Sequence, residues 1–291
     1  MNLSRSRALA LIASAPLLAR CTTSGSIRVG SKNFTESIVI GEIYAQALEA
    51  AGMRVERRLN LGSTQIALAA IQRGDIDLYP EYTGTALIDV LHHAPVATPE
   101  QTFEIVDKAF SARYGLSWLA PSPMNDSQGI ATTAALAQRY HLRTLSDLAS
   151  AAPRLRLATI QEFLARPDGL PGLQKRYGGF HFKSVRTYDI ALKYQALLDG
   201  RADVATAFTT DGAIAANHLQ LLADDKHLWP PYNVAPVVRA ALLGDDRAVA
   251  TLNAVSPKIT SAVASRMNEM VESEKQDPAD VARAFLKGSI R

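Results

Sequence analysis

Aromatic and hydroxyl side chains gather where one predicted strand ends. The run DLYPEYTGTAL, residues 77–87, places Tyr82 and Thr85 directly after a short apolar segment. Phe208 ends a second strand-like run, and Tyr232 follows a stiff Trp-Pro-Pro segment. Because open α/β sheets bind ligands beyond the carboxyl ends of their strands, these rings are candidates for the wall of one pocket. Ordinary packing is the alternative for each ring taken alone.

Several rings around one cleft suit a particular kind of ligand, a cation without N–H donors. Hydrogen bonds cannot hold a trimethylammonium group, and full pairing with a buried carboxylate is costly. The negative faces of aromatic rings attract such a cation by roughly 0.5–2 kcal/mol per ring, depending on desolvation. The aromatic positions therefore predict a pocket for a quaternary ammonium compound.

Signatures of catalysis, cofactor binding and metal binding are missing from the sequence. It contains no Gly-x-Ser-x-Gly, no phosphate-binding Gly-x-x-x-x-Gly-Lys-Ser/Thr and no dinucleotide-binding Gly-x-Gly-x-x-Gly. None of the six histidines pairs with another at the i, i+4 spacing of a helical zinc site. We therefore expect no enzymatic activity, no catalytic residues, no cofactor and no metal.

The amino end, residues 1–21, has the pattern of a signal peptide. Arginines precede the apolar run 8–19, which is too short to span a bilayer as a permanent helix. Cys21 is the only cysteine and ends a segment similar to a lipoprotein cleavage box, although Arg20 fits that box poorly. Lipid attachment at Cys21 and simple cleavage nearby both stay open. We predict an exported protein that is periplasmic or otherwise extracytoplasmic.

The formal net charge of +3 is due to the predicted signal peptide. The signal holds three arginines, so its removal leaves 31 − 3 = 28 basic residues against 28 acidic ones. A mature chain with a net charge near zero gives no general electrostatic case for binding nucleic acid or an anionic membrane. We expect a monomer whose ligand is a small molecule.

Strand and helix patterns alternate after residue 26, which predicts an α/β fold with mainly parallel sheets. In the helical run 34–52 we expect Asn33 to act as the N-cap, with Glu36 at the third position. Further helices are expected over 63–74, from Thr98 and from Asp277. The strand-like runs are 26–31, 53–61, 75–79, 116–121, 154–160, 184–189 and 202–208.

Two segments of the chain match each other without gaps, residues 70–85 and 196–211. In each, a helix ends on glycine, an aspartate follows three residues later, and an aromatic-threonine pair comes after a short strand. The match indicates two comparable α/β lobes, each presenting an aromatic ring beyond a strand. Two facing lobes form a cleft that can close on a small molecule.

At these residues the sequence resembles the osmoprotectant-type substrate-binding proteins of ABC importers, which bind glycine betaine, choline and related compounds. The similarity covers nearly all of the chain after the signal. The resemblance implies a two-lobed type II periplasmic-binding fold, with one lobe over 26–121 plus 236–291 and the other over 122–235. It also implies a membrane permease and a cytoplasmic ATPase as partners. The motifs that carry it are GSKNFTE (30–36), NLGSTQIALAAIQRGDIDLYPEYTGTAL (60–87), FTTDG (208–212) and LLADDKHLWPPYNVAPVVR (221–239).

The resemblance also assigns ligand-binding residues by position. Tyr82, Phe208 and Tyr232 match the rings of the family's aromatic cage, and Thr85 matches a threonine that holds the ligand's polar end. Phe208 stands where many members have tyrosine. Where members of the family typically read Asn-Asn/Asp-Thr-Tyr-Ala, this chain has Asn125-Asp-Ser-Gln128-Gly, so Gln128 stands in place of an aromatic residue. Asn125 and Gln128 are expected to contact the polar part of the ligand, and Gln128 is expected to cause either weaker binding of quaternary ammonium compounds or a preference for a more polar ligand.

Charged residues near these motifs have two interpretations each. Lys32 could reach the cleft or lie on the surface. Asp211 is expected to cap a helix, and strand alternation is expected to turn Glu81 away from Tyr82. Two rival functions stay open: a binding protein of the same fold for another small polar solute, such as an amino acid derivative, and an exported enzyme that uses Asp126 or Glu81 as acid or base.

Overall fold

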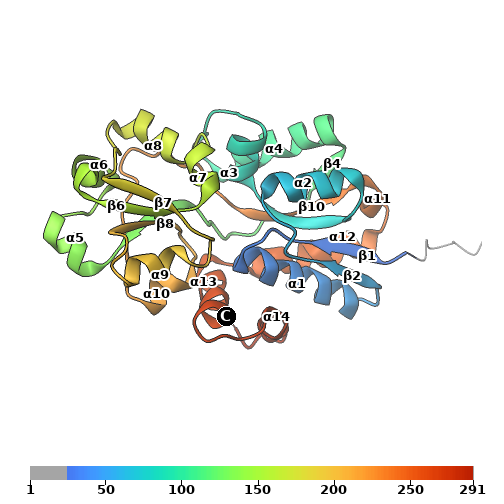
Figure 1. The fold of residues 1–291 in the computed structure, drawn as a ribbon. Helices are drawn as coiled ribbons and strands as arrows, with labels where there is room; N and C mark the ends of the chain where they lie inside the picture. The colour runs from blue at the N-terminus through green and yellow to red at the C-terminus, as the bar shows by residue number, and fades with distance from the viewer. Residues whose placement is uncertain (1–24, 291) are drawn as a thin grey trace, which may run out of the picture.

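The computed structural model describes residues 25–290, so the predicted signal peptide and Cys21 lie outside the described residues. Two five-stranded sheets form two lobes side by side, each covered by helices (Figure 1). Lobe 1 is built on the sheet of order β2-β1-β3-β10-β4, and lobe 2 on the sheet of order β7-β6-β8-β5-β9. The α/β fold class with two lobes is as the sequence predicts.

The strands of lobe 1 come from both ends of the described chain, whereas those of lobe 2 come from its middle. Lobe 1 contains β1 (Ile27–Gly30), β2 (Val55–Arg58), β3 (Leu78–Tyr82), β4 (Leu116–Trp118) and β10 (Val234–Arg239). Lobe 2 contains β5 (Gln128–Thr132), β6 (Arg156–Thr159), β7 (Ser184–Thr187), β8 (Val204–Phe208) and β9 (Gln220–Leu221). The exact lobe boundaries stay a prediction, although β10 already begins at Val234.

Helices connect the strands and cover both faces of each sheet (Figure 1). Before β5 they are α1 (Thr35–Ala50), α2 (Thr64–Arg73), α3 (Thr83–Thr85), the π-helical turn η1 (Ala86–Val90) and α4 (Pro99–Tyr114). Lobe 2 has α5 (Ala134–Tyr140), α6 (Leu145–Ala151), the 3-10 turn η2 (Ala152–Arg154), α7 (Gln161–Ala165), α8 (Leu170–Tyr177), α9 (Lys193–Leu198) and α10 (Gly212–Ala216). After β10 come α11 (Ala240–Leu243), α12 (Asp246–Val255), the 3-10 turn η3 (Ser256–Lys258), α13 (Ser261–Glu272) and α14 (Pro278–Leu286).

The sheets are mainly parallel, as predicted, but each contains one strand that runs against the other four. In lobe 1, β1 pairs in parallel with β2 and β3, but β10 is antiparallel to β3 and β4. In lobe 2, β5 is likewise antiparallel to β8 and β9. The reason is topological: β5 and β10 are the strands with which the chain enters a lobe from the other one, so each runs against its neighbours.

Helix termini follow local sequence rules at some positions and tertiary packing at others. Thr98 caps α4 as predicted, because its side chain accepts from the backbone N–H of Gln101, and Asp277 caps α14. The prediction for Asn33 is wrong: the N-cap of α1 is Phe34, with no side-chain cap. Glu36 is buried in this first turn and serves a different contact, described below.

The internal match is confirmed in three dimensions. Arg28 donates to Asp77 through its backbone N–H at 2.9 Å and its Nε at 3.0 Å. In lobe 2, Arg156 contacts Asp203 through the same two donors, both at 2.8 Å. Each pair ties the start of one strand to the segment before its parallel neighbour. The match therefore places Tyr82 and Phe208 at equivalent strand ends.

The lobes also touch through the carboxyl-terminal part of the chain. Helix α13 of lobe 1 packs against α10 of lobe 2 (Figure 1). Gly212 allows this approach, since a Cβ atom there would lie 2.3 Å from the backbone nitrogen of Glu269. Within residues 25–290, no helix is long and apolar enough to cross a membrane.

Candidate functional site

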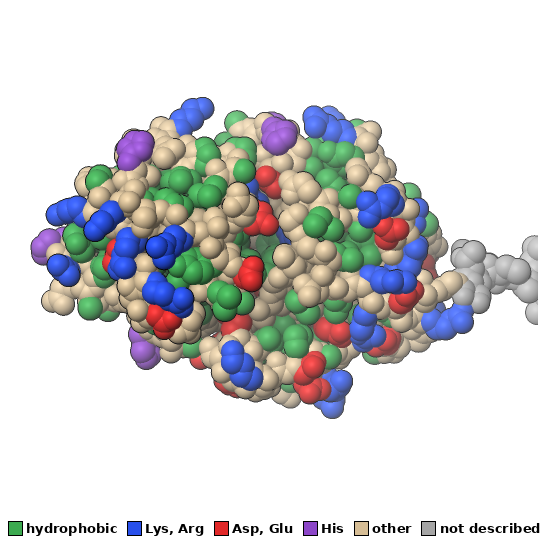
Figure 2. All heavy atoms as spheres, viewed as in Figure 1, with side chains coloured by type: hydrophobic (Ala, Val, Ile, Leu, Met, Phe, Trp, Pro, Cys, Tyr) green, Lys and Arg blue, Asp and Glu red, His purple; other side chains and the backbone are tan. Residues whose placement is uncertain are grey.

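A cavity of about 510 Å³ lies between the lobes, within the size range of small-molecule sites. Figure 2 shows it as a hollow between the two halves, with acidic side chains at its edge. Lobe 1 lines it with Lys32, Asn33, Phe34, Asn60, Ser63, Thr64, Tyr82 and Thr85. The two crossing segments that connect the lobes, residues 119–127 and 222–233, and lobe 2 itself add Asp126, Gln128, Ile160, Gln161, Glu162, Phe163, Arg166, Tyr188, Asp189, Ile190, Ala191, Phe208 and Tyr232. Six of the seven predicted binding residues are in this lining, and Asn125 is not.

Three aromatic rings form a cluster in this cavity. The ring centroids of Phe34 and Tyr82 are 5.8 Å apart, and those of Phe34 and Phe208 are 6.0 Å apart in a stacked arrangement. Tyr82 and Phe34 belong to lobe 1 and Phe208 to lobe 2, so the cluster spans the cleft. No strand-end pattern in the sequence singles out Phe34, because it lies at the N-cap of α1, four residues after the end of β1.

Tyr82 is fixed by a buried carboxyl group at its hydroxyl end. Its hydroxyl donates to Glu36 at 2.7 Å, and the other oxygen of Glu36 accepts from the hydroxyl of Thr210. Burial raises the pKa of Glu36, while the bonds from Thr210, Tyr82 and Asn268 oppose that shift. Burial and the nearby Glu36 raise the pKa of Tyr82 well above its ordinary value, so this phenol is a donor over the physiological range. The expected cap residue Glu36 therefore orients a cavity ring.

Tyr232 lines the cavity but is held from behind by two polar contacts. Its hydroxyl donates to Asp168, and its backbone N–H donates to the side-chain oxygen of Asn125 at 2.7 Å. Asn125 thus faces the backbone of a crossing segment, where it also forms an isolated bridge with Asn233. The expectation that Asn125 lines the pocket is corrected accordingly: it positions Tyr232.

Two lysine side chains lie over faces of the clustered rings. The Nζ atom of Lys32 is 4.6 Å from the centroid of Tyr82 and 2.6 Å from Oε1 of Glu81. The Nζ atom of Lys193 is 4.6 Å from the centroid of Phe208. Lys32 therefore reaches the cleft rather than the surface. Glu81 is fully buried, and its Oε1 atom also accepts from the backbone N–H of Tyr82 at 2.7 Å.

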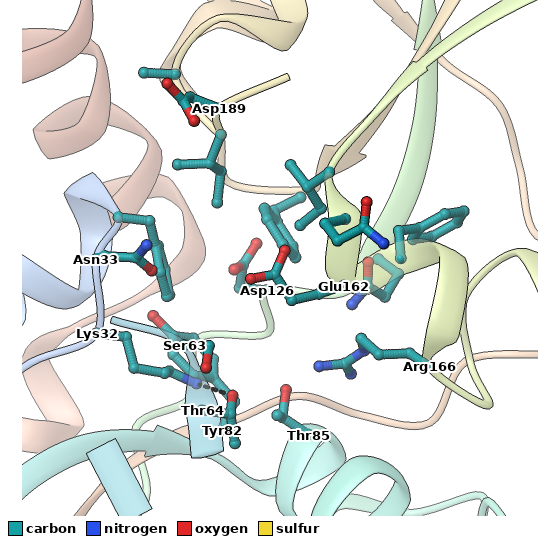
Figure 3. A pocket seen from close by; sticks show the side chains of 18 of the residues that line it. Lys32, Asn33, Ser63, Thr64, Tyr82, Thr85, Asp126, Glu162, Arg166 and Asp189 are labelled. Carbon is teal, nitrogen blue, oxygen red and sulfur yellow. Dashed lines mark hydrogen bonds between the residues drawn. The ribbon is translucent and has the colours of Figure 1, made fainter. Parts of the chain in front are cut away.

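Arg166 also lines the cavity, although no motif in the sequence singles it out. Its Nε and Nη2 atoms donate to the carboxylate of Asp168 at 2.8 and 2.7 Å. Its Nη1 atom is 3.7 Å from Asp89 of lobe 1, too far for a hydrogen bond, so N–H groups remain for a ligand. Burial alone would lower the pKa of Arg166, but Asp168 raises it above its ordinary value. In Figure 3 the guanidinium points toward Thr85.

Two polar cavity side chains are buried and have no hydrogen-bond partner among residues 25–290. Thr85 and Gln128 are both 6 % exposed, and no side-chain bond joins either to the described protein. The fully buried side-chain atoms that lack a hydrogen-bond partner do not include any atom of Thr85 or Gln128. Their polar atoms therefore keep accessible surface, which the cavity provides.

The remaining acidic groups differ in exposure and in role. Burial raises the pKa of Asp126 well above its ordinary value, as do the nearby charges of Glu36 and Asp211. Asp211 does not cap α10 with its side chain, against the prediction. It instead accepts from Lys193 at 2.9 Å and from the Tyr194 hydroxyl at 2.6 Å, because it faces into lobe 2. Over residues 25–290, no group of His, Cys, Asp and Glu side chains is arranged to hold a metal ion.

Comparison with known proteins matches the chain to substrate-binding proteins of transport systems. Residues 25–288 match the family model described as the substrate-binding domain of the ABC-type glycine betaine transport system. The chain is 31% identical over 261 residues to an ergothioneine transport permease/binding protein (EgtU) of Helicobacter pylori strain G27, with 89% of this chain and 47% of the relative covered. The chain thus spans about half the length of that relative.

A second relative and a solved structure match over most of their own length. The carnitine transport binding protein OpuCC of Listeria monocytogenes strain 10403S is 30% identical over 294 residues, covering 95% of this chain and 93% of the relative. A crystal structure titled as a glycine betaine/carnitine/choline ABC transporter superposes with a TM-score of 0.74 at 30% identity. It covers 90% of this chain and 98% of that one.

Proposed function

We propose that the inter-lobe cavity binds a trimethylammonium carboxylate. The premise is that this chain belongs to the family of substrate-binding domains of ABC-type glycine betaine transport systems. The single observation that carries this proposal is the ring cluster of Phe34, Tyr82 and Phe208 from opposite lobes. Desolvated aromatic faces attract a methylated cation that no hydrogen bond can hold. The same rings would do little for a ligand that is only anionic or neutral.

A carboxylate would bind at the edge of the ring cluster, where Lys32 lies over the Tyr82 ring and Arg166 and Thr85 also line the cavity. Arg166 keeps free N–H groups on Nη1, and the Thr85 hydroxyl has no partner among the described residues (Figure 3). Both cations are already paired, with Asp168 and Glu81, so their charges are held in place before a ligand arrives. Preorganised donors of this kind bind a carboxylate without the cost of ordering long side chains.

Closure of the lobes would report occupancy to the membrane components. A ligand that contacts Phe34 in one lobe and Phe208 in the other stabilises the form in which both contacts exist. We infer that this protein is a monomeric, extracytoplasmic component that delivers its ligand to a permease driven by a cytoplasmic ATPase, and that it carries out no chemistry. Cleavage or lipidation near Cys21 is part of the same proposal.

Calorimetric titration of the purified protein tests the proposal directly. Glycine betaine and choline should bind, whereas glycine, which has an ammonium group with N–H donors and no methyl groups, should not. A tightly bound solute also raises the unfolding temperature, because it stabilises the folded state by RT ln(1 + [L]/Kd). Binding of glycine with an affinity equal to that of the methylated compounds would favour the rival, an amino acid binding protein of the same fold.

A further inference from the structure

Gln128 is a buried amide that faces the cavity without a partner. It is 6 % exposed, lines the inter-lobe cavity, and makes no side-chain hydrogen bond to residues 25–290. An amide has two N–H donors and a carbonyl acceptor, all of which need partners when water is excluded. Leaving these atoms without partners on burial costs more than a typical hydrogen bond contributes. In the open cavity, water can serve these atoms.

The amide lies next to the aromatic cluster because of strand pairing. Gln128 is the first residue of β5 and is directly paired with Phe208, the last residue of β8. Paired residues on neighbouring strands project from the same face of the sheet, with Cβ atoms ~5 Å apart. Since the Phe208 ring also stacks on Phe34, a cation held by these rings would leave its next atoms beside the Gln128 amide.

A ligand that places only methyl groups next to Gln128 would leave the amide without hydrogen-bond partners. Trimethylammonium methyls neither donate nor accept conventional hydrogen bonds, so such a ligand displaces water from Gln128 and replaces none of its bonds. A site built to hydrogen-bond a polar group rejects the analogue that lacks it, because the buried protein group is left unpaired. The amide therefore disfavours the simplest betaines.

We propose that Gln128 determines specificity by selecting ligands that carry, besides the trimethylammonium and the carboxylate, a third group able to hydrogen-bond. The inference rests on the proposed function, because the rings must hold the cation for the amide to meet the third group. A hydroxyl near the ammonium and a nitrogen- or sulfur-bearing heteroaromatic ring share this chemistry. Thr85 does not replace Gln128 here, since it lies in lobe 1 beside Arg166, among the residues assigned to the carboxylate (Figure 3).

The test compares ligands with and without the additional hydrogen-bonding group. L-carnitine and deoxycarnitine have the same chain length and differ by one hydroxyl, and ergothioneine is compared with glycine betaine. Dissociation constants are measured by calorimetry for the wild type, for Gln128→Met, which keeps the length and removes the amide, and for Gln138→Met. Gln138 is an exposed residue of α5 outside the cavity and is the matched control.

In the wild type and in Gln138→Met, we expect one polar ligand to bind about 5- to 150-fold more tightly than its simpler partner, the range that an unpaired buried group produces. The pair that shows the preference identifies the hydroxyl or the heteroaromatic source. In Gln128→Met this preference should collapse while deoxycarnitine and glycine betaine bind more tightly, which also shows that the variant is folded.

An unchanged preference in Gln128→Met, or tighter binding of deoxycarnitine and glycine betaine than of both polar ligands by the wild type, overturns the inference and leaves the proposed function standing. If no trimethylammonium compound binds to the wild type, the proposed function fails and the inference fails with it.

Discussion

Glu36 of lobe 1 accepts a hydrogen bond from Thr210 of lobe 2, with 2.5 Å between Oε2 and Oγ1. The same carboxyl group accepts from the Tyr82 hydroxyl through Oε1. One buried group therefore connects a ring of the cavity with a contact between the lobes. A displacement of the Tyr82 ring by a ligand would change the geometry of the carboxyl group that Thr210 contacts.

Removal of the Thr210 hydroxyl should destabilise the folded protein. In Thr210→Val, the buried Oε2 atom of Glu36 keeps only the hydrogen bond from Asn268. We therefore expect the free energy of unfolding to fall by about 1–3 kcal/mol. Urea denaturation measures the change. Thr187→Val, at an exposed site on the edge strand β7, is the control and should change the free energy little. Equal losses in the two variants would contradict a buried inter-lobe bond.

Replacement of Phe34 should weaken binding of methylated cations. In Phe34→Leu the site remains apolar but loses one ring of the cluster, so we expect the dissociation constant of a bound trimethylammonium ligand to rise about 2- to 30-fold. Calorimetry on the wild type, Phe34→Leu and Phe34→Tyr gives the comparison. Phe34→Tyr keeps a ring and should stay near the wild type. If the leucine variant binds as well as the tyrosine variant, apolar contact rather than ring electrostatics holds the cation.

Arg166 should distinguish ligands by their carboxylate. In Arg166→Gln, glycine betaine loses a charge-assisted hydrogen bond of about 1.5–3 kcal/mol, whereas choline has no carboxylate to lose it. We expect affinity for glycine betaine to fall at least tenfold relative to choline, as measured by titration of both ligands. Choline binding also verifies that the variant is folded. Arg186→Gln, at an exposed position on β7, should leave the ratio unchanged; parallel losses for both ligands would remove Arg166 from the carboxylate site.

Glu272 should make stability fall as the pH rises toward neutrality. Burial raises its pKa from 4.5 to about 7, helped by the charge of Asp211, while Thr35 and Lys193 oppose the shift. Between about pH 4.5 and 7 the folded state therefore holds a proton that the unfolded state has already released. The stability that this proton contributes at low pH is lost as the pH rises across the interval, by roughly 3 kcal/mol at most.

Glu272→Gln cannot titrate and should reduce that slope. Unfolding free energies of the two proteins measured from pH 5 to pH 8 test this, with Glu274→Gln, on the exposed segment after α13, as the control. Glu36 and Asp126 also have raised pKa values, so some slope of the same sign should remain. An identical pH profile for wild type and Glu272→Gln would show that Glu272 titrates normally.

Much of the fold follows from local patterns in the sequence. The 2-residue and 3.6-residue periods locate most strands and helices, because each reflects one buried face. Thr98 and Asp277 cap helices as expected, since a cap depends on a few adjacent residues. The repeated glycine-aspartate-aromatic spacing led to Tyr82 and Phe208, because equivalent spacing in two similar lobes leads to equivalent strand ends.

Tertiary structure decided what surrounds these residues. Phe34 joins the ring cluster, Arg166 enters the cavity and Asn125 turns away from it, although nothing in their local sequence distinguishes these outcomes. The antiparallel entry of β5 and β10 sets the strand register, and the register decides which side chains face the cleft. Whether a polar group such as Gln128 is paired depends in turn on neighbours that are distant in sequence. The sequence thus determined where the aromatic rings lie along the chain. Only the packing of one lobe against the other determined which groups these rings and the polar side chains beside them contact.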